Sequence, residues 1–169
     1  MRAKPSTMNR RVLISLVIGF LLIGLLLLPM PLQAGDTDIL INEIMYAPVP
    51  TEEGHEWIEI YNRGTTDVDL TGWKFYENST DHNLVLHRGS MTIPSGGYAV
   101  IADDADTFLS DYPSYSGTLI DSTWGTLHND GESLALKNGS GDIVDQVDYS
   151  GAWGGGSGYS LECIKLGFF

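Results

Sequence analysis

The chain has 169 residues, of which 22 are Asp or Glu and nine are Lys or Arg, so its formal net charge at pH 7 is −13. A chain this acidic repels phosphate backbones, which argues against a nucleic-acid-binding protein. Its single cysteine, Cys163, excludes an internal disulfide, so a hydrophobic core has to hold the fold together. We expect this lone thiol to be a small buried hydrophobic group.

Residues 1–34 have the features of an export signal. Four basic residues, all within residues 2–11, precede an apolar run over residues 12–28 in which Ser15 is the one polar residue, as in a signal peptide. The run also reaches the roughly 17–25 residues that span a bilayer. Two outcomes stay open: cleavage of residues 1–34 as a signal peptide, or a signal anchor that contacts the membrane only through residues 12–28.

Both outcomes place residues 35–169 outside the cytosol, because the basic residues stay on the inner side. Pro29 and Pro31 end the apolar run, and Ala34 before Gly35 supplies a small residue at the expected cleavage point. We therefore expect a secreted or extracytoplasmic protein of the cell envelope, or a membrane-anchored one if the signal is not cleaved.

The charge becomes more negative if residues 1–34 are lost. They hold four basic residues and no acidic ones, so the net charge moves from −13 to −17. The five remaining basic residues are dispersed along the chain rather than grouped, and we expect no nucleic-acid partner. These five are Arg63, Lys74, Arg88, Lys137 and Lys165.

After the export signal, short alternating runs recur about every ten residues, with turn residues between them. This pattern predicts an all-β fold, an antiparallel sandwich of two sheets. Alternation places Ile58 and Ile60 on the core face, and Leu134 and Leu136 likewise. The strands are expected near residues 39–46, 56–62, 68–76, 83–86, 98–102, 118–122, 133–137, 142–149 and 159–164.

One segment departs from the strand pattern. Residues 104–112 end just before Pro113 and begin with acidic residues that can cap a helix. We expect a short surface helix here, with Asp104 or Asp106 as its N-cap.

Three phrases in one order carry a family resemblance: Ile41-Asn42-Glu43-Ile44-Met45-Tyr46, then Glu56-Trp57-Ile58-Glu59-Ile60-Tyr61-Asn62, then Val68-Asp69-Leu70-Thr71-Gly72-Trp73. A later stretch adds Trp124-Gly125 and the strands that follow it. Over residues 38–164 the chain resembles the lamin tail domain, which ends nuclear lamins and also occurs in exported bacterial proteins. The resemblance implies an immunoglobulin-like β-sandwich. It also implies structural roles for Asn42, Glu43, Glu56, Trp57, Glu59, Asn62, Leu70, Gly72, Trp73, Trp124 and Gly125.

Catalytic candidates are lacking in the sequence. The four histidines do not have the spacing of a zinc pair, and no nucleophile motif is present. Asp103, Asp104 and Asp106 form the best Ca²⁺ candidate, although they do not match the EF-hand loop. Helix capping and solvation are the simpler alternative, and we expect no other cofactor.

The aromatic residues leave two interpretations open. Trp124, Trp153 and Tyr159 stand beside turns or strand ends, where they would form an exposed platform for a glycan or protein partner. The alternative is that the tryptophans pack in the core, covering the edge of the sandwich.

These observations predict an exported, monomeric, non-enzymatic interaction or structural module that binds a protein or a cell-surface glycan. Two other functions remain open. One is an accessory domain of a truncated extracellular hydrolase, with the nuclease or phosphatase encoded further downstream, and the other is a Ca²⁺-dependent surface adhesion module.

Overall fold

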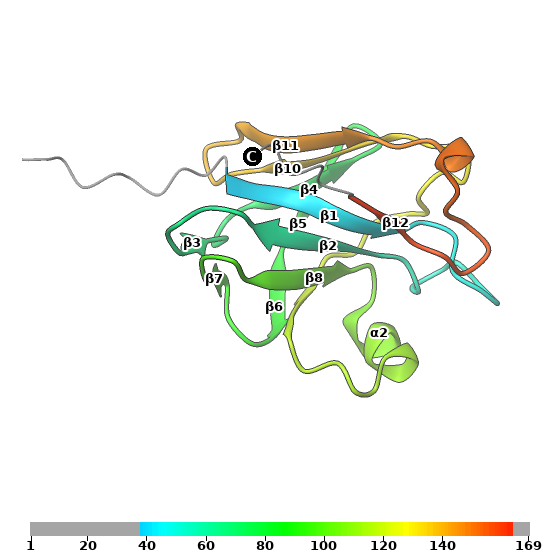
Figure 1. Ribbon diagram of the computed structural model, residues 1–169, viewed down its shortest axis with the longest axis horizontal. Helices are drawn as coiled ribbons and strands as arrows, with labels where there is room; N and C mark the ends of the chain where they lie inside the picture. Colours follow the sequence, from blue (N-terminus) through cyan, green and yellow to red (C-terminus); the bar gives the residue numbers. More distant parts are fainter. Residues whose placement is uncertain (1–37, 164–169) are drawn as a thin grey trace, which may run out of the picture. The chain divides into compact units, whose positions relative to one another are not determined.

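Two β-sheets face each other in the computed structural model, which describes residues 38–163 (Figure 1). The predicted signal segment, residues 1–34, lies outside the described residues. The larger sheet has six strands in the order β12-β1-β2-β8-β9-β6. Its strands are β1 (Ile39–Met45), β2 (Trp57–Asn62), β6 (Val85–Arg88), β8 (Tyr98–Ala102), β9 (Thr118–Asp121) and β12 (Leu161–Glu162).

The smaller sheet has four strands in the order β11-β10-β4-β5. They are β4 (Lys74–Glu77), β5 (Thr80–Asn83), β10 (Ser133–Lys137) and β11 (Ile143–Asp148). A separate pair joins β3 (Val68–Asp69) to β7 (Thr92–Ile93), and a short 3₁₀ helix, η3 (Gly151–Trp153), follows β11. The all-β sandwich expected from the alternating runs is confirmed.

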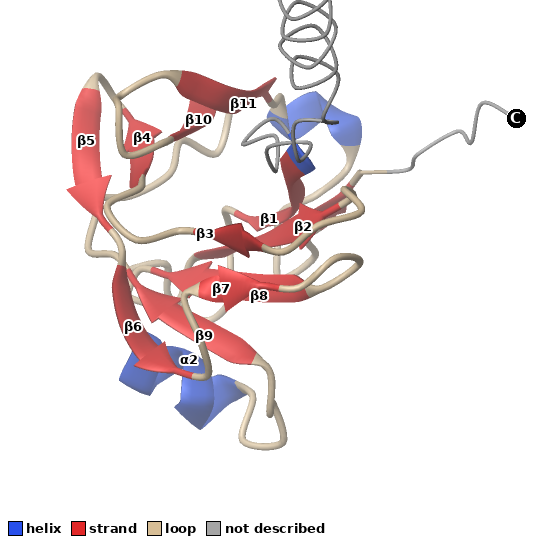
Figure 2. Ribbon diagram, turned by 90° about the vertical axis from the view of Figure 1, so that its left-hand side faces the viewer, coloured by secondary structure: helices blue, strands red, loops and turns tan. Residues whose placement is uncertain are grey.

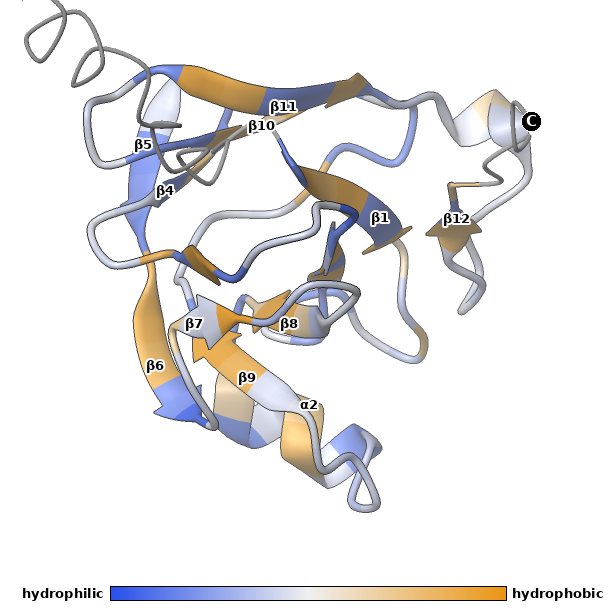
Figure 3. Cartoon of the chain, turned by 60° about the vertical axis from the view of Figure 1, so that its left-hand side comes forward, coloured by the Kyte–Doolittle hydropathy of each residue, from blue (hydrophilic) through white to orange (hydrophobic). Residues whose placement is uncertain are grey.

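The core lies between the two sheets and is made by the predicted faces. Ile58, Ile60, Leu134 and Leu136 are all fully buried, as alternation required. Figure 3 shows the hydrophobic stretches of β1, β8 and β9 within the six-stranded sheet. Cys163 is exposed, so the prediction of a buried thiol is wrong: this residue lies just past the end of the short edge strand β12.

A second, smaller apolar cluster covers the outer face of the six-stranded sheet. Here α2 (Ala105–Asp111) packs Ala105 and Phe108 against Trp57 and Val100. Figure 2 shows α2 on the side of this sheet that faces away from the four-stranded sheet. The helix begins where the sequence predicted, because the side chain of Asp104 accepts a hydrogen bond from Thr107 N at 2.7 Å and caps the first turn.

One strand pair departs from the antiparallel expectation. β8 and β9 run parallel, with Val100 opposite Leu119. A parallel neighbour needs a crossover connection, and the segment that carries α2 provides it. Every other pair of these sheets is antiparallel among the described residues.

Two predicted strands are divided in the structure. Residues 68–76 were expected as one strand but form β3 and β4, because Gly72 adopts a positive φ of 80° and Asp69 accepts a hydrogen bond from Thr71 N. The strand expected at residues 83–86 is divided at Leu84, so that β5 belongs to one sheet and β6 to the other. Within residues 38–163, the single α-helix is too short and too polar to cross a membrane.

Candidate functional site: an apolar cleft between two edge strands

The phrases that carry the family resemblance build the frame of the sandwich. Glu56 is buried, 1% exposed, and accepts hydrogen bonds from Trp124 Nε1 at 3.0 Å and from Leu127 N at 2.9 Å. Asp103 accepts from Trp124 N at 2.8 Å and from Gly54 N at 3.1 Å. These two carboxylates hold the segment before β10 against the end of the six-stranded sheet.

Neither carboxylate has a basic partner among the groups that bond to it. Burial raises the pKa of Glu56 to about 8, and its hydrogen bonds to Leu127 and Trp124 only partly offset this effect. Burial likewise raises the pKa of Asp103. A raised pKa often marks an active site, but both groups are bonded to backbone and indole N–H donors, as in a structural clamp.

Asn62 is a second framing residue, fully buried at the end of β2. Its side-chain amide donates to Thr66 O at 2.9 Å and to Ile93 O at 3.0 Å, and its Oδ1 accepts from Gly64 N at 2.9 Å. The turn after β2 is therefore tied to β7. Together with the buried side chains of Leu70 and Trp73, these bonds fit the structural roles that the resemblance implied.

The Ca²⁺ candidate residues do not converge. Asp103 faces Trp124 and Gly54, Asp104 caps α2, and Asp106 is exposed with His87 Nε2 at 3.6 Å. No group of three or more metal-ligating side chains occurs in the part of the chain that the structure describes. Helix capping accounts for the position of Asp104 in this segment.

The three residues of the predicted aromatic platform differ in exposure: Trp124 is buried, whereas Trp153 and Tyr159 are exposed. Trp124 is 6% exposed and packs against Phe75 with ring centroids 4.8 Å apart, so its assignment to an exposed platform is wrong. The buried hydrogen bond from Trp124 Nε1 to Glu56 holds the indole in the core. Trp153 and Tyr159, in contrast, are 63% and 74% exposed.

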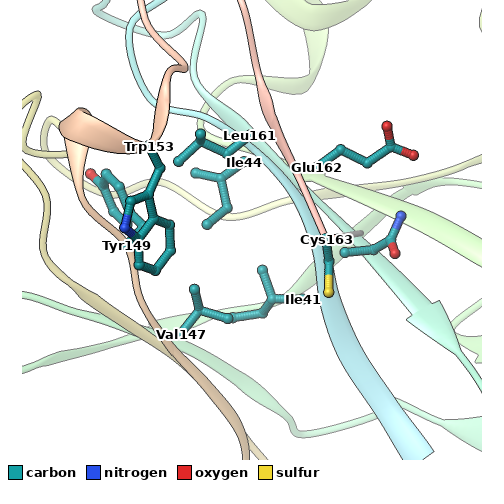
Figure 4. Close-up of a pocket in the computed structure, with 9 residues that line it drawn as sticks. Ile41, Ile44, Val147, Tyr149, Trp153, Leu161, Glu162 and Cys163 are labelled. Carbon is teal, nitrogen blue, oxygen red and sulfur yellow. The ribbon is translucent and has the colours of Figure 1, made fainter. Parts of the chain in front are cut away.

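Trp153 lies beside an apolar cleft of about 210 Å³. The side chains of Ile41, Ile44, Val147 and Leu161 converge on this space, with Tyr149 and Trp153 on one side and Cys163 on the other (Figure 4). Tyr159 does not line the cleft.

The cleft lies where the two sheets approach each other, because β1, β11 and β12 all contribute residues to its walls. Ile41 N on β1 donates to Asp145 Oδ2 on β11 at 2.8 Å, which joins the sheets. Beyond this bond, β12 pairs with β1 at Glu43 and Ile44, and Cys163 N donates to Asn42 O at 2.7 Å. β12 and β11 are the terminal strands of their sheets, so the cleft lies between two sheet edges.

Carboxylates occupy the outer side of β12, β1 and β2 next to the cleft. Glu162 lies opposite Glu43, and Glu43 lies opposite Glu59, which forms a row across the three strands. Burial raises the pKa of Glu59, and the negative charges of Glu43 and Glu162 raise it further. A hydrogen bond from Asn42 Nδ2 to Glu59 Oε1, at 2.9 Å, acts in the opposite direction.

The sequence indicated Trp153 but not the residues around it. Val147 and Leu161 looked like ordinary members of alternating strands, and the packing of their strands decides that they line a cleft. The half-buried state of a terminal strand gives no separate sequence signal.

Two basic residues that are 63 positions apart in the sequence lie side by side in the structure. Lys74 and Lys137 are opposite each other on β4 and β10. Lys137 Nζ bonds to Asp81 Oδ1 at 2.6 Å and lies over the ring of Tyr76, whereas Lys74 Nζ donates to Asn83 Oδ1. Lys137 is therefore paired with an acidic side chain and Lys74 with a polar one.

Comparison with known proteins assigns the fold to a family. No curated protein matches the chain. The Lamin Tail Domain family matches over residues 33–151, a range that contains the Glu56 clamp and ends before Trp153 and β12. Because this range covers more than half of the 169 residues, the chain belongs to the Lamin Tail Domain family.

Proposed function

We propose that this protein is an exported, non-enzymatic interaction module that binds a protein or cell-surface component at the cleft beside Trp153. Its family is one of immunoglobulin-like interaction or structural domains. The observation that carries the proposal is the exposed indole of Trp153 at the mouth of an apolar cleft. A large exposed aromatic side chain next to an apolar depression is typical of binding surfaces.

The exposure of Trp153 supports binding rather than core packing, since this side chain stands outside the core that the aliphatic walls of the cleft join. The fold is held by the main core between the sheets and by the Glu56 clamp, and neither includes the side chain of Trp153. We propose that the module works as a monomer, with a negative surface that disfavours nucleic acids.

Replacing Trp153 with alanine tests the proposal. The purified protein is immobilised and incubated with envelope material from its own host, and the retained components are identified by mass spectrometry. We expect a specific component that the wild type retains and the Trp153→Ala variant loses, because the indole supplies much of the contact area. Tyr159→Ala is the matched control, since Tyr159 is an aromatic residue at least as exposed as Trp153 but does not line the cleft. Equal retention by all three proteins would reject the role of this surface.

Export is a separate expectation that intact-mass analysis tests. We expect a mature species that begins at Gly35, because the basic start and apolar run precede Ala34. A membrane-bound species that keeps Met1 would indicate the anchor instead. A cytosolic product with its N-terminus intact would contradict both outcomes.

A further inference from the structure

We infer that the cleft accepts one large apolar side chain from a partner polypeptide, and that basic residues flank this anchor in the partner. The inference rests on the proposed function and specifies its ligand. It goes beyond the family match, because Trp153, Leu161 and Cys163 lie outside residues 33–151.

The volume of the cleft sets the size of what enters it. Pockets for drug-sized ligands usually measure roughly 300–1,000 Å³, and this cleft measures about 210 Å³. A cavity of about 150 Å³ lined by similar aliphatic groups accommodates benzene. The cleft therefore fits a single phenylalanine, leucine or similar side chain rather than a whole small-molecule ligand.

The walls favour a polypeptide over a glycan. Four aliphatic side chains converge on the space, which suits an apolar group better than a hydroxylated sugar (Figure 4). The cleft also lies between the terminal strands β11 and β12. Edge strands present backbone N–H and C=O groups that pair with an extended chain, so the anchor and the backbone of one segment are recognised together.

Charge complementarity defines the residues beside the anchor. Glu162 lines the cleft, and Glu43 and Glu59 continue the row of carboxylates away from it. The residues that line the cleft include no lysine or arginine. Like charges facing each other across an interface oppose binding and opposite charges favour it, so the partner segment carries Lys or Arg next to its anchor.

The test uses three synthetic peptides and the purified full chain. Acetyl-Lys-Lys-Phe-Lys-Lys-amide is the probe, the version with four Glu in place of Lys reverses the charge, and the version with Ala in place of Phe removes the anchor. Binding is followed through the indole N–H resonance of Trp153. We expect the Lys-Phe peptide to bind at least about tenfold more tightly than either control, a factor that corresponds to about 1.4 kcal/mol. Added salt should reduce the difference between the Lys and Glu peptides.

Chemical modification of the single cysteine, Cys163, gives two adducts that differ in the size of the added group. Cys163 is exposed and lines the cleft, so N-phenylmaleimide places a phenyl group at its wall, whereas methyl methanethiosulfonate adds only a small group. We expect the phenyl adduct to abolish binding of the Lys-Phe peptide and the small adduct to preserve it. Near-ultraviolet circular dichroism confirms that both adducts stay folded.

Several outcomes would overturn the inference. Equal affinity for the Lys and Glu peptides would remove the charge argument, and binding of the Ala peptide would remove the anchor. Peptide binding that begins only after deletion of residues 164–169 would mean that the chain's own segment is the occupant. A concentration-dependent dimer that excludes the peptide would assign the cleft to a second copy. In each case, loss of the envelope component in Trp153→Ala would still support the proposed function.

Discussion

Glu56→Ala is expected to lower the free energy of unfolding by about 2–6 kcal/mol. The substitution leaves two buried donors, Trp124 Nε1 and Leu127 N, without their acceptor, and each unsatisfied buried group costs roughly 1–3 kcal/mol. The segment that these bonds hold should loosen, with Trp124 becoming more exposed. Denaturant unfolding followed by tryptophan fluorescence measures both effects.

Glu53→Ala is the matched control, because Glu53 is an exposed glutamate three residues earlier in the chain. We expect it to change stability by no more than about 0.5 kcal/mol. If Glu56→Ala were as mild as this control, the clamp would have no structural importance.

The same clamp makes stability depend on pH. The pKa of Glu56 is about 8 in the folded protein, against about 4.5 for the ordinary group. Between these values the folded state holds a proton that the unfolded chain has released, so the stabilising contribution is complete below about pH 4.5 and is lost as the pH rises through 8. Asp103 has a raised pKa and acts in the same direction. Side-chain hydrogen bonds lower the pKa values of Asp69 and Asp148. Their contributions to stability are therefore present at neutral pH and are lost only as the pH falls through these lowered values.

Glu56→Gln isolates this contribution because the amide cannot ionise. We expect the stability of the wild type to fall between pH 5 and 9 more steeply than that of Glu56→Gln. Parallel curves for the two proteins would show that Glu56 stays ionised in the fold.

Ile60→Ala is expected to cost about 2–5 kcal/mol, the usual range for deleting a buried aliphatic side chain that leaves a cavity. Ile60 is fully buried on β2 between the two sheets. Equilibrium unfolding in urea measures the loss.

Ile143→Ala makes the same chemical change at an exposed position, since Ile143 is 54% exposed on β11. We expect a cost below about 1 kcal/mol there. A loss below half a kilocalorie for Ile60→Ala would mean that the core face of β2 had been misassigned.

The sequence by itself determined the core faces of the strands, the cap of the helix and the family. Alternation of side chains has a period of two in any strand, so it identified the core faces of β2 and β10 before any packing was known. Asp104, one of the two N-cap candidates that the sequence offered, caps the helix, because an N-cap depends only on nearby backbone N–H groups. The phrases from Asn42 to Trp73 likewise indicated the Lamin Tail Domain family, which the match over residues 33–151 confirms.

Contacts between distant residues were decided only by the tertiary structure. Glu56 and Leu127 are 71 positions apart, and Glu56 also bonds to the buried indole of Trp124, for which the sequence left both an exposed platform and core packing open. The cleft depends on the packing of β1, β11 and β12, which brings Ile44, Val147 and Leu161 together around one space. The periodicity of a strand says which face is apolar, but it does not say which other strand lies across from that face. The candidate binding surface therefore follows from the packing of the two sheets, and apart from Trp153 its side chains have no signal of their own in the sequence.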